Sequence, residues 1–382
     1  MKIVVNTRLL ISEKLSGIGW FKYHTLKRLV KWHPEHQFVF LFDRKYEDQF
    51  IFGDNVIPEV IFPPTRHPLL SYIWFEYSIV NTIKKHKPDL FYSPDGYLSL
   101  KLKDIPSVPV IHDINFYHYP KDLPYITSQY YQYFFPKFAN VAKRIITVSE
   151  YSKRDIATHF NITPDRIDVA YNGANEIFEP LAEAQKVAVK KELTDGYEYF
   201  VYVGVLVPRK NITRMLQAFN EFKKTSGSKT KLVIVGAKMF LTSDMEKAYQ
   251  QSAFKDDILF TGRLSTKRLK LVMGAAKSLV YVSYFEGFGI PIVEAMNADL
   301  PVITSNITAM PEIAGNAALL VDPFSIDAIK EAMLAMDKDE TLRGKLIDNA
   351  RIRRNNFSWD KTAGKVWESI ERAVNIIRVV SI

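Results

Sequence analysis

Short runs of β-branched and aromatic residues alternate along the chain with longer segments whose apolar residues recur at helical spacing. This alternation is typical of βαβ units, in which helices join parallel strands and cover the sheet. A first series of strands is predicted over Lys2–Asn6, Gln37–Phe42, Val56–Ile61, Asp89–Ser93, Val108–His112, Arg144–Val148 and Ile167–Tyr171. A second series is predicted over Tyr199–Val205, Lys231–Val235, Ile258–Thr261, Leu279–Ser283, Pro301–Thr304 and Ala318–Val321. The pattern therefore predicts an α/β protein with two Rossmann-like parallel-sheet lobes.

The boundary between the two lobes is predicted just after the first series of strands. Tyr171-Asn172-Gly173 ends that series, and Asn-Gly is a turn signal. We expect an N-terminal domain over residues 1–175 and a C-terminal domain over residues 176–358. The segment Trp359–Val380 carries apolar residues at helical spacing, so it predicts an amphipathic helix that needs a partner surface.

The composition narrows the classes of protein. The 382 residues include no cysteine, which excludes disulfide scaffolds, zinc–thiolate sites, iron–sulfur clusters and a catalytic thiol. The 51 basic and 42 acidic residues leave a net charge of +9, which suits a phosphate-bearing substrate, nucleic acid or an anionic membrane face. No apolar stretch approaches the roughly 18 residues of a spanning helix, and the N-terminus has no signal-peptide layout. We therefore expect a cytoplasmic protein, either soluble or peripheral at the inner face of the membrane.

The segment from Tyr284 to Met296 carries the strongest chemical signal. It follows a predicted strand and opens a helix, with Pro291 at a plausible first helical position. The glycines at 287 and 289 let the backbone approach a ligand closely, and the amides of Gly287–Ile290 then point outward at a helix N-terminus, which favours phosphate.

Two glutamates flank this loop, Glu286 before the glycines and Glu294 in the expected first helical turn. Carboxylates oppose a phosphate, so they make sense as acceptors for the neutral hydroxyls of a ribose and a sugar ring. The alternative reading of these residues alone is a glycine turn whose Glu294 caps its own helix.

Two adjacent cations follow the first strand of the second series. Arg209 and Lys210 lie at a strand-to-helix junction, where they can give a diphosphate a bidentate fork and a point charge. Ligands of open parallel sheets bind at the carboxyl ends of the strands, and both this turn and the glycine loop lie at such ends.

Five motifs support one family. They are Glu286-x7-Glu294, Pro208-Arg209-Lys210-Asn211, Thr147-Val148-Ser149-Glu150-Tyr151-Ser152-Lys153, Tyr171-Asn172-Gly173 and Thr261-Gly262-Arg263. Together they resemble glycosyltransferase family 4, the group 1 retaining transferases of the GT-B fold. The resemblance runs nearly from end to end of the chain.

The resemblance implies two lobes that face each other across a cleft. A nucleotide-diphosphate sugar, as UDP or GDP sugar, would lie mainly on the C-terminal lobe, a glycan or lipid-linked acceptor would lie mainly on the N-terminal lobe, and the helix 359–382 would cross back onto the N-terminal lobe. The implied catalytic residues are His112, Asp113, Arg209, Lys210 and Glu286. The implied donor-binding residues are Gly17, Gly19, Gly204, Arg263, Leu264, Gly287, Phe288, Gly289, Ile290 and Glu294.

The matched positions also imply individual roles. Glu294 would bind the ribose, Glu286 the donor sugar's hydroxyls, Arg209 with Lys210 the diphosphate, and the backbone around Arg263 the base. In the N-terminal lobe, Gly17-Ile18-Gly19 resembles the family's glycine loop that faces the donor phosphates, and His112-Asp113 ends a strand where the family has a His near the donor sugar.

Two features of the sequence bear on the implied donor site: a departure from the family's Gly-Arg pair and the expected lack of a metal. Many relatives carry Gly-Arg where this chain has Gly204-Val205, so Arg209 and Lys210 must supply more of the charge compensation. We expect no metal and no cofactor: the Asp337-Lys338-Asp339 triplet lies in an acidic helical stretch, and the histidines show no ligand spacing. The two cations and the helix N-terminus would take the place of Mg²⁺.

Ten of the residues from Phe116 to Phe138 are aromatic. Ordinary core packing, an acceptor groove and a membrane-contacting helix are all open readings of this segment.

The predicted activity is a metal-independent, retaining transfer of a hexose, such as mannose or glucose, from the nucleotide sugar to an acceptor hydroxyl. The acceptor would attack on the same face through an oxocarbenium-like state, and surface polysaccharide or lipopolysaccharide-type glycan assembly is the expected setting. A non-catalytic nucleotide-sugar-binding subunit and a GT-B nucleotide-sugar epimerase are the alternatives. Nucleic-acid binding rests on charge alone and is discounted, and contact with an anionic membrane stays open.

Overall fold

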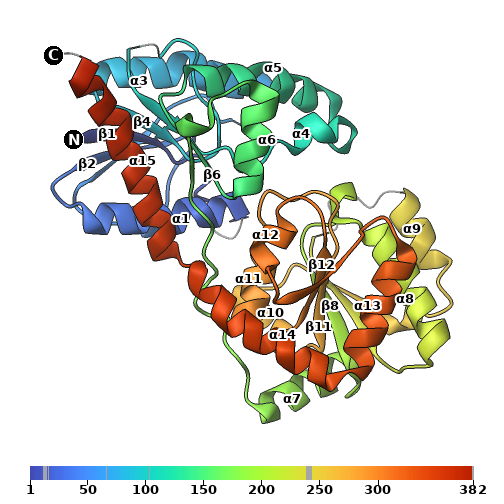
Figure 1. Cartoon of the computed structure of the whole chain (residues 1–382). Helices are drawn as coiled ribbons and strands as arrows, with labels where there is room; N and C mark the ends of the chain where they lie inside the picture. Colours follow the sequence, from blue (N-terminus) through green and yellow to red (C-terminus); the bar gives the residue numbers. More distant parts are fainter. Residues whose placement is uncertain (12–14, 16, 66, 103, 238–242, 381–382) are drawn as a thin grey trace. The chain divides into compact units, whose positions relative to one another are not determined.

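The chain divides into two compact units in the computed structural model (Figure 1), which describes residues 1–382 except 12–14, 16, 66, 103, 238–242 and 381–382. Lobe 1 comprises Met1–Gly173 with Ser358–Ile382, and lobe 2 comprises Ala174–Phe357. The first boundary lies two residues before the predicted one. The backbone of Gly173 passes so close to the returning chain that a Cβ there would lie 2.5 Å from the Trp359 amide nitrogen.

Lobe 1 is built on a parallel sheet of order β3-β2-β1-β4-β5, followed by the parallel pair β6-β7. A single bridge between Val110 and Ile146 continues the first sheet into the second. The strands are β1 (Lys2–Asn6), β2 (Gln37–Phe42), β3 (Val56–Val60), β4 (Leu90–Ser93), β5 (Ser107–Pro109), β6 (Ile145–Thr147) and β7 (Ile167–Val169). The helices are α1 (Gly17–Trp32), α2 (Pro68–Ile73), α3 (Ile79–His86), α4 (Asn115–His118), α5 (Tyr125–Val141), α6 (Glu150–Phe160) and α15 (Trp359–Val380).

Lobe 2 holds one six-stranded parallel sheet of order β10-β9-β8-β11-β12-β13. Its strands are β8 (Tyr199–Val203), β9 (Lys231–Val235), β10 (Ile258–Gly262), β11 (Ser278–Tyr281), β12 (Val302–Ser305) and β13 (Ala318–Val321). Its helices are α7 (Glu183–Thr194), α8 (Ile212–Ser226), α9 (Ser243–Gln250), α10 (Thr266–Gly274), α11 (Ile290–Asn297), α12 (Met310–Ala314), α13 (Ile326–Lys338) and α14 (Glu340–Arg353). The central strands are buried on both faces, as expected when helices cover both sides of a parallel sheet.

Every predicted strand is present, which confirms the α/β class with two Rossmann-like lobes. The largest difference concerns Val108–His112, where β5 already ends at Pro109 and His112 lies in the following loop. The neighbouring strand β4 ends at Ser93, just before Pro94, and beyond it Val110 forms only an isolated bridge, to Ile146 of β6.

The C-terminal helix α15 packs against α1 of lobe 1 (Figure 1). The ring of Trp367 stacks on His33 with centroids 3.6 Å apart, and the Thr362 hydroxyl donates to the Tyr171 carbonyl at 2.5 Å. The apolar face expected from the sequence therefore has its partner in lobe 1. The side chain of Ile377, which belongs to the predicted apolar set, lies outside the described residues.

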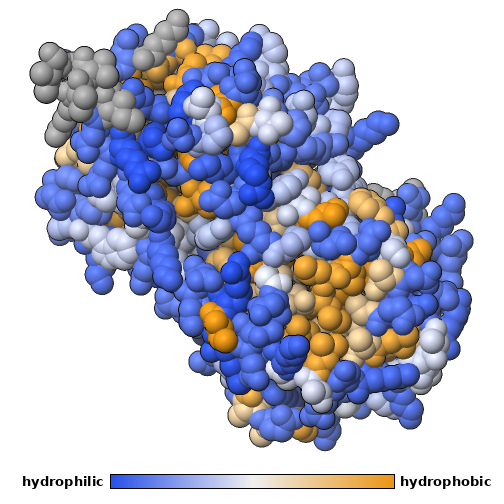
Figure 2. Space-filling view, viewed as in Figure 1, coloured by the Kyte–Doolittle hydropathy of each residue, from blue (hydrophilic) through white to orange (hydrophobic). Residues whose placement is uncertain are grey.

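The surface carries both hydrophilic and hydrophobic residues. Hydrophilic groups predominate on the face shown in Figure 2, with apolar areas on both lobes. Among the described residues, no helix is both long enough and apolar enough to cross a membrane.

Candidate active site

In lobe 2 the predicted catalytic residues come together at one edge of the sheet. β8 and β11 are adjacent parallel strands, so the turn with Arg209 and Lys210 and the loop with Glu286 end side by side. Arg209 Nη1 donates to Glu286 Oε2 at 3.0 Å, and Lys210 Nζ donates to Glu286 Oε1. The Tyr281 hydroxyl donates to the same Oε1 at 2.9 Å and accepts from Lys210 at 2.6 Å.

The turn that presents the two cations is fixed by the residue after them. Pro208 opens a single 3₁₀ turn, and Asn211 ends it in the left-handed region with φ of 61°. The Asn211 amide group donates to the carbonyls of Val282 and Pro323 at 3.0 and 2.6 Å. The Tyr284 amide donates to the Arg209 carbonyl at 3.0 Å, so the cationic turn and the Glu286 loop are joined through the backbone as well.

The Glu286 carboxylate is buried but ionised. Burial alone would raise its pKa, yet the charges of Lys210 and Arg209 and the hydrogen bonds lower the pKa to about 2. The three side chains therefore carry one net positive charge at neutral pH. That excess suits an anionic ligand, and Arg209 is the most exposed of the three, with 23% of its side chain in contact with solvent.

The glycine loop leads directly into α11. Gly289 caps the helix with φ of 96°, a conformation that favours glycine, and its Cβ would lie 3.0 Å from Ile292 Cδ1. The helix begins at Ile290, so Pro291 is its second residue rather than its first. Gly287 and Phe288 are buried in the preceding loop.

Glu294 differs from Glu286 in its position, its partners and its pKa. It is the fifth residue of α11, one position beyond the first turn in which we expected it, and is therefore no cap for its own helix. Its side chain is half-buried and makes no hydrogen bond or ion pair with any residue that the structure describes. Burial raises its pKa to about 7.

The remaining lobe 2 residues lie along the same edge but outside the cluster. Gly204 follows β8, and its carbonyl oxygen would lie 1.8 Å from a Cβ on Gly236, so these two chain segments approach closely. Arg263 and Leu264 follow β10, which is separated from β8 by β9. With about 4.8 Å between neighbouring strands, β10 lies roughly 10 Å from β8.

In lobe 1, His112 and Asp113 line a cavity of about 420 Å³ together with Arg8, Tyr130 and Tyr131. His112 Nε2 lies 3.2 Å from the Pro94 carbonyl, so the neutral ring carries its proton there and leaves Nδ1 as an acceptor. Burial lowers the pKa of His112 and keeps the ring neutral. Asp113 Oδ1 accepts from the amide of Asn115, the first residue of α4, at 3.0 Å, and Ile114 is the N-cap of that helix.

Gly17 and Gly19 are not in a loop. Gly17 is the first residue of α1 and Gly19 is the third, so the connection after β1 ends before residue 17. Gly19 packs under Leu15, whose Cδ2 would lie 3.0 Å from an added Cβ. The expectation of a glycine loop at this position is therefore wrong, and these residues supply amides of a helix N-terminus instead.

The aromatic segment serves more than one purpose. Phe116, Phe135 and Phe138 belong to the core of lobe 1, and Phe116 and Phe135 also line the cavity together with Tyr130 and Tyr131. A third set is exposed on α4 and α5, namely Tyr117, Tyr125 and Tyr133.

Sequence reasoning missed a charged cluster in lobe 1. Asp95 Oδ2 accepts from Arg8 Nε at 2.8 Å and lies 3.5 Å from Lys22 Nζ, and all three side chains are buried. Asn6 Nδ2 donates to Asp95 Oδ1 at 2.7 Å. The available signal was that Arg8 and Asp95 directly follow two predicted strands, β1 and β4, which turn out to be neighbours.

The acidic triplet has structural partners on both of its aspartates. Asp337 pairs with Lys277 at 2.8 Å, and Asp339 caps α14 by accepting from the Leu342 amide at 2.8 Å. The fold also assembles two histidine groups that the sequence spacing did not show, His33-Glu35-His36 and His118-Asp155-His159.

Comparison with known proteins covers both lobes. Residues 15–176 match the family described as Glycosyltransferase Family 4, and residues 184–353 match Glycosyl transferases group 1. The O-antigen chain mannosyltransferase B of Escherichia coli is 26% identical over 374 residues, which cover 94% of this chain and 97% of that protein. The O-antigen chain mannosyltransferase RfbU of Salmonella typhimurium is 32% identical over 213 residues, 56% of each chain.

A solved structure extends the likeness to the fold. Sucrose-phosphate synthase from Thermosynechococcus elongatus superposes with a TM-score of 0.78 at 17% identity, over 98% of this chain and 100% of that one. The matches to both family descriptions, the full-length relative and the two Rossmann-like lobes agree with one another. The chain belongs to the group 1 glycosyltransferases of family 4 and has the GT-B fold.

Proposed function

We propose that this glycosyltransferase moves a hexose, mannose in the first place, from a nucleotide-diphosphate sugar to an acceptor hydroxyl with retention of anomeric configuration. The observation that carries the proposal is the convergence of Arg209, Lys210 and Glu286 at the carboxyl edge of the lobe 2 sheet, next to α11. The relatives named O-antigen mannosyltransferases support mannose and a role in assembling a surface polysaccharide or lipopolysaccharide-type glycan.

The donor diphosphate is assigned to the cationic turn. Arg209 offers its solvent-facing guanidinium and Lys210 its ammonium, and the amides at the start of α11 add further donors. This arrangement stabilises the negative charge that develops on the leaving diphosphate, which is the task of Mg²⁺ in other phosphate sites. We therefore propose a transfer that needs no metal at the donor.

The two glutamates are assigned to the hydroxyls of the donor. Glu286 holds both cations in place and presents its carboxylate edge to the transferred sugar, whereas Glu294, which has no partner within the described residues, accepts from the ribose. The separation of roughly 10 Å between β8 and β10 suits the reach from a diphosphate to its base, so Arg263 and Leu264 are assigned to the base.

The acceptor is assigned to the lobe 1 cavity. Its tyrosines offer flat apolar walls for a sugar ring, and His112 offers a neutral acceptor nitrogen. His112 and Asp113 are the proposed catalytic residues of this lobe. A retaining transfer would then proceed by same-face attack, with the departing phosphate helping to remove the acceptor proton.

A donor panel tests the proposal. The purified chain is incubated with GDP-mannose, UDP-glucose and UDP-galactose and a synthetic mannosyl acceptor, with EDTA throughout, and the product anomer is assigned by NMR. Transfer from one donor with α configuration retained is the expected result. An inverted product, dependence on added Mg²⁺, or donor hydrolysis without transfer to any acceptor would each contradict one part of the proposal.

Contact with an anionic membrane is proposed from the surface of α5. Tyr125, Ile126 and Tyr133 are exposed there, and Lys137 Nζ lies 3.3 Å from the Tyr133 ring centroid. Exposed rings beside lysines favour a charged lipid interface. Co-flotation with phosphatidylglycerol vesicles, lost in a Tyr125→Ser/Ile126→Ser variant, is expected; equal flotation of both proteins would contradict it.

A further inference from the structure

A cluster in lobe 1 that has no part in the proposed transfer brings two imidazoles onto one carboxylate. His118 is the last residue of α4, whereas Asp155 and His159 lie one turn apart on α6. His118 Nε2 lies 2.8 and 3.0 Å from the two Asp155 oxygens, and His159 Nδ1 lies 3.0 Å from Asp155 Oδ1. One ligand atom from each of the three residues therefore lies within 4.8 Å of the other two.

We propose that His118, Asp155 and His159 form a binding site for a transition-metal dication of the zinc class, which ties α4 to α6. Two imidazole nitrogens and one carboxylate oxygen make a ligand set that Zn²⁺ and Co²⁺ prefer, and that Mg²⁺ does not. Ligand atoms about 2.0–2.2 Å from a tetrahedral ion lie roughly 3.4 Å from one another. The Asp155 contacts of 2.8 and 3.0 Å would open by about half an ångström, and His159 Nδ1 would exchange its hydrogen bond to the Asp155 backbone carbonyl, now 2.9 Å, for the ion.

The surroundings favour a defined site rather than a surface ion pair. The Asp155 side chain is only 7% exposed, and it is held by α6, whereas both histidines are partly exposed and leave a path for the ion and a place for water as a further ligand. The two imidazole rings are nearly perpendicular, at 82°, with their centroids 4.8 Å apart.

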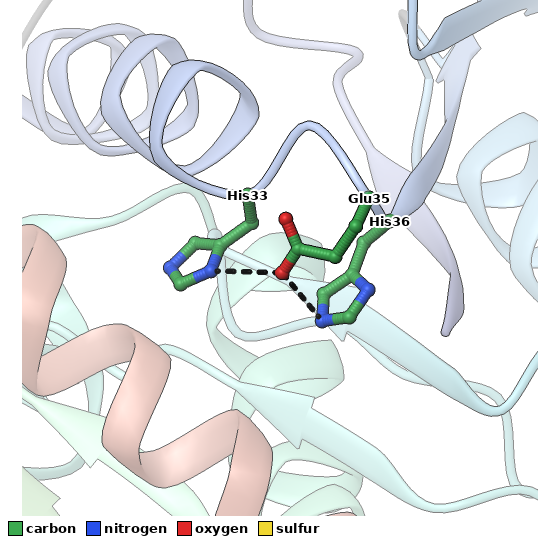
Figure 3. Close-up of side chains that lie close together, drawn as sticks. All are labelled: His33, Glu35 and His36. Carbon is green, nitrogen blue, oxygen red and sulfur yellow. Dashed lines mark ion pairs between the residues drawn. The ribbon is translucent and has the colours of Figure 1, made fainter.

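The second histidine group provides a natural control. His33 and His36 approach one oxygen of Glu35 at 3.6 and 3.4 Å (Figure 3). The Glu35 side chain is 60% exposed, the His33 ring stacks on Trp367, and all three residues come from one four-residue segment. This group also joins two histidines to one carboxylate, that of Glu35, but it lacks a buried carboxylate and a second helix.

The position of the site gives the ion a structural consequence. Asp113 accepts from the first amide of α4, which ends at His118, and Ser152 on α6 donates its hydroxyl proton to the His112 carbonyl at 3.3 Å. An ion that joins α4 to α6 would therefore restrain the His112–Asp113 segment from both ends. The proposal itself stands on the ligand geometry and does not depend on the proposed transfer.

Cobalt binding tests the site directly. The untagged full chain is titrated with Co²⁺, and the visible absorption of a low-coordinate nitrogen–oxygen site is recorded together with thermal unfolding in Zn²⁺, Co²⁺ and Mg²⁺. We expect saturable absorption, a rise of a few degrees in Tm with Zn²⁺ and Co²⁺, and no rise with Mg²⁺.

Variants assign the signal to residues. His118→Gln and His159→Gln should each weaken Co²⁺ binding at least about tenfold, while Glu35→Gln should leave it unchanged. Both histidines are partly exposed, so these variants are expected to fold, which circular dichroism checks. The proposal is overturned if the wild-type chain gives no saturable absorption, if the signal survives His118→Gln/His159→Gln, or if it disappears in Glu35→Gln.

Discussion

Each lobe places one carboxylate between an arginine and a lysine at the carboxyl edge of its sheet. In lobe 1, Asp95 follows β4 and Arg8 follows β1; in lobe 2, Glu286 follows β11 and Arg209 follows β8. The strands correspond, because β1–β4 and β8–β11 are the equivalent neighbouring pairs of the two sheet orders. The same local solution to burying a carboxylate therefore occurs twice in one chain.

The two clusters differ in how much of their side chains is exposed to solvent. Lys22 is fully buried, and its ammonium makes no hydrogen bond within the described residues, whereas Lys210 donates to both Glu286 and Tyr281 and Arg209 reaches solvent. The Asp95 cluster is buried, although Arg8 and Asp95 also line the lobe 1 cavity. The Glu286 cluster leaves Arg209 partly exposed and carries one excess positive charge, so we expect it to bind an anion. Exposure rather than residue type therefore distinguishes the two clusters.

The largest effect on stability is expected when the Asp95 cluster of lobe 1 loses its carboxylate charge. Asp95→Asn keeps the shape of the side chain but leaves Arg8 and Lys22 buried without a counter-charge. Removing one partner of a buried ion pair costs about 3–5 kcal/mol, so the free energy of unfolding should fall by that amount. Urea unfolding followed by circular dichroism measures it, and a loss below about 1 kcal/mol, the value of a surface pair, would show that the cluster is not a structural pair.

A mutation in the Glu286 cluster of lobe 2 should instead lower activity and leave stability almost unchanged. Arg209→Ala is expected to lower kcat/KM by about 10²–10³-fold, because one preorganised donor to the leaving group is lost. Its Tm should stay close to that of the wild type, since the guanidinium is partly solvated. Lys224→Ala, at an exposed lysine of α8 in the same lobe, is the matched control and should change neither quantity.

The two glutamates of lobe 2 should give opposite pH dependences of stability. The Glu286 pKa of about 2 lies below the unfolded value near 4.5, so its contribution is present above pH 4.5 and lost as the pH falls toward 2. The Glu294 pKa of about 7 lies above the unfolded value, so the native state binds the extra proton between pH 4.5 and 7 and stability falls as the pH rises through that window.

Glu294→Gln isolates the second contribution. The variant should match the wild-type Tm near pH 5 and exceed it by a few degrees at pH 8, while its KM for the donor rises about tenfold because the ribose loses a charged acceptor. Differential scanning calorimetry across pH and initial-rate kinetics measure the two effects. A Tm difference that stays constant from pH 5 to pH 8 would contradict the unpartnered state of this carboxylate.

The strands and the placement of Arg209, Lys210 and Glu286 after neighbouring strands could be predicted from the sequence because their signals are local. A buried parallel strand is a short apolar run, and each of these residues lies in the loop that follows such a run. The end of β5 and the helical state of Gly17 could not be predicted, because the apolar run continues beyond the end of the strand and a Gly-x-Gly pattern does not distinguish a loop from a helix N-terminus.

The clusters that the sequence concealed depend on pairs that are far apart in it. Asp95 lies 87 positions from Arg8, and Asp155 lies 37 positions from His118. A lone Asp or His gives no sign of its partner until the strand order or the packing of α4 on α6 is known. Only the i,i+4 spacing of Asp155 and His159 was visible, and that spacing is common on helix surfaces.

The smallest expected effect concerns the lysine of the Asp95 cluster. The Lys22 ammonium makes no hydrogen bond to the residues that the structure describes, and burial lowers its pKa to about 8, whereas the unfolded value is near 10.5. Between these values the unfolded chain holds the proton and the native chain does not, so the wild type gains stability as the pH rises from 8 to 10.5.

Lys22→Met fills the same space without a charge and leaves the Arg8–Asp95 pair intact. At pH 7 its free energy of unfolding should lie within about 1 kcal/mol of the wild type, because an apolar side chain of similar volume replaces a buried ion at little cost. The gain between pH 8 and 10 should be absent from the variant, and urea unfolding of both proteins at the two pH values measures that difference. If Lys22→Met is as unstable as Asp95→Asn, the ammonium is an essential partner of Asp95, and the two clusters are more alike than their exposure suggests.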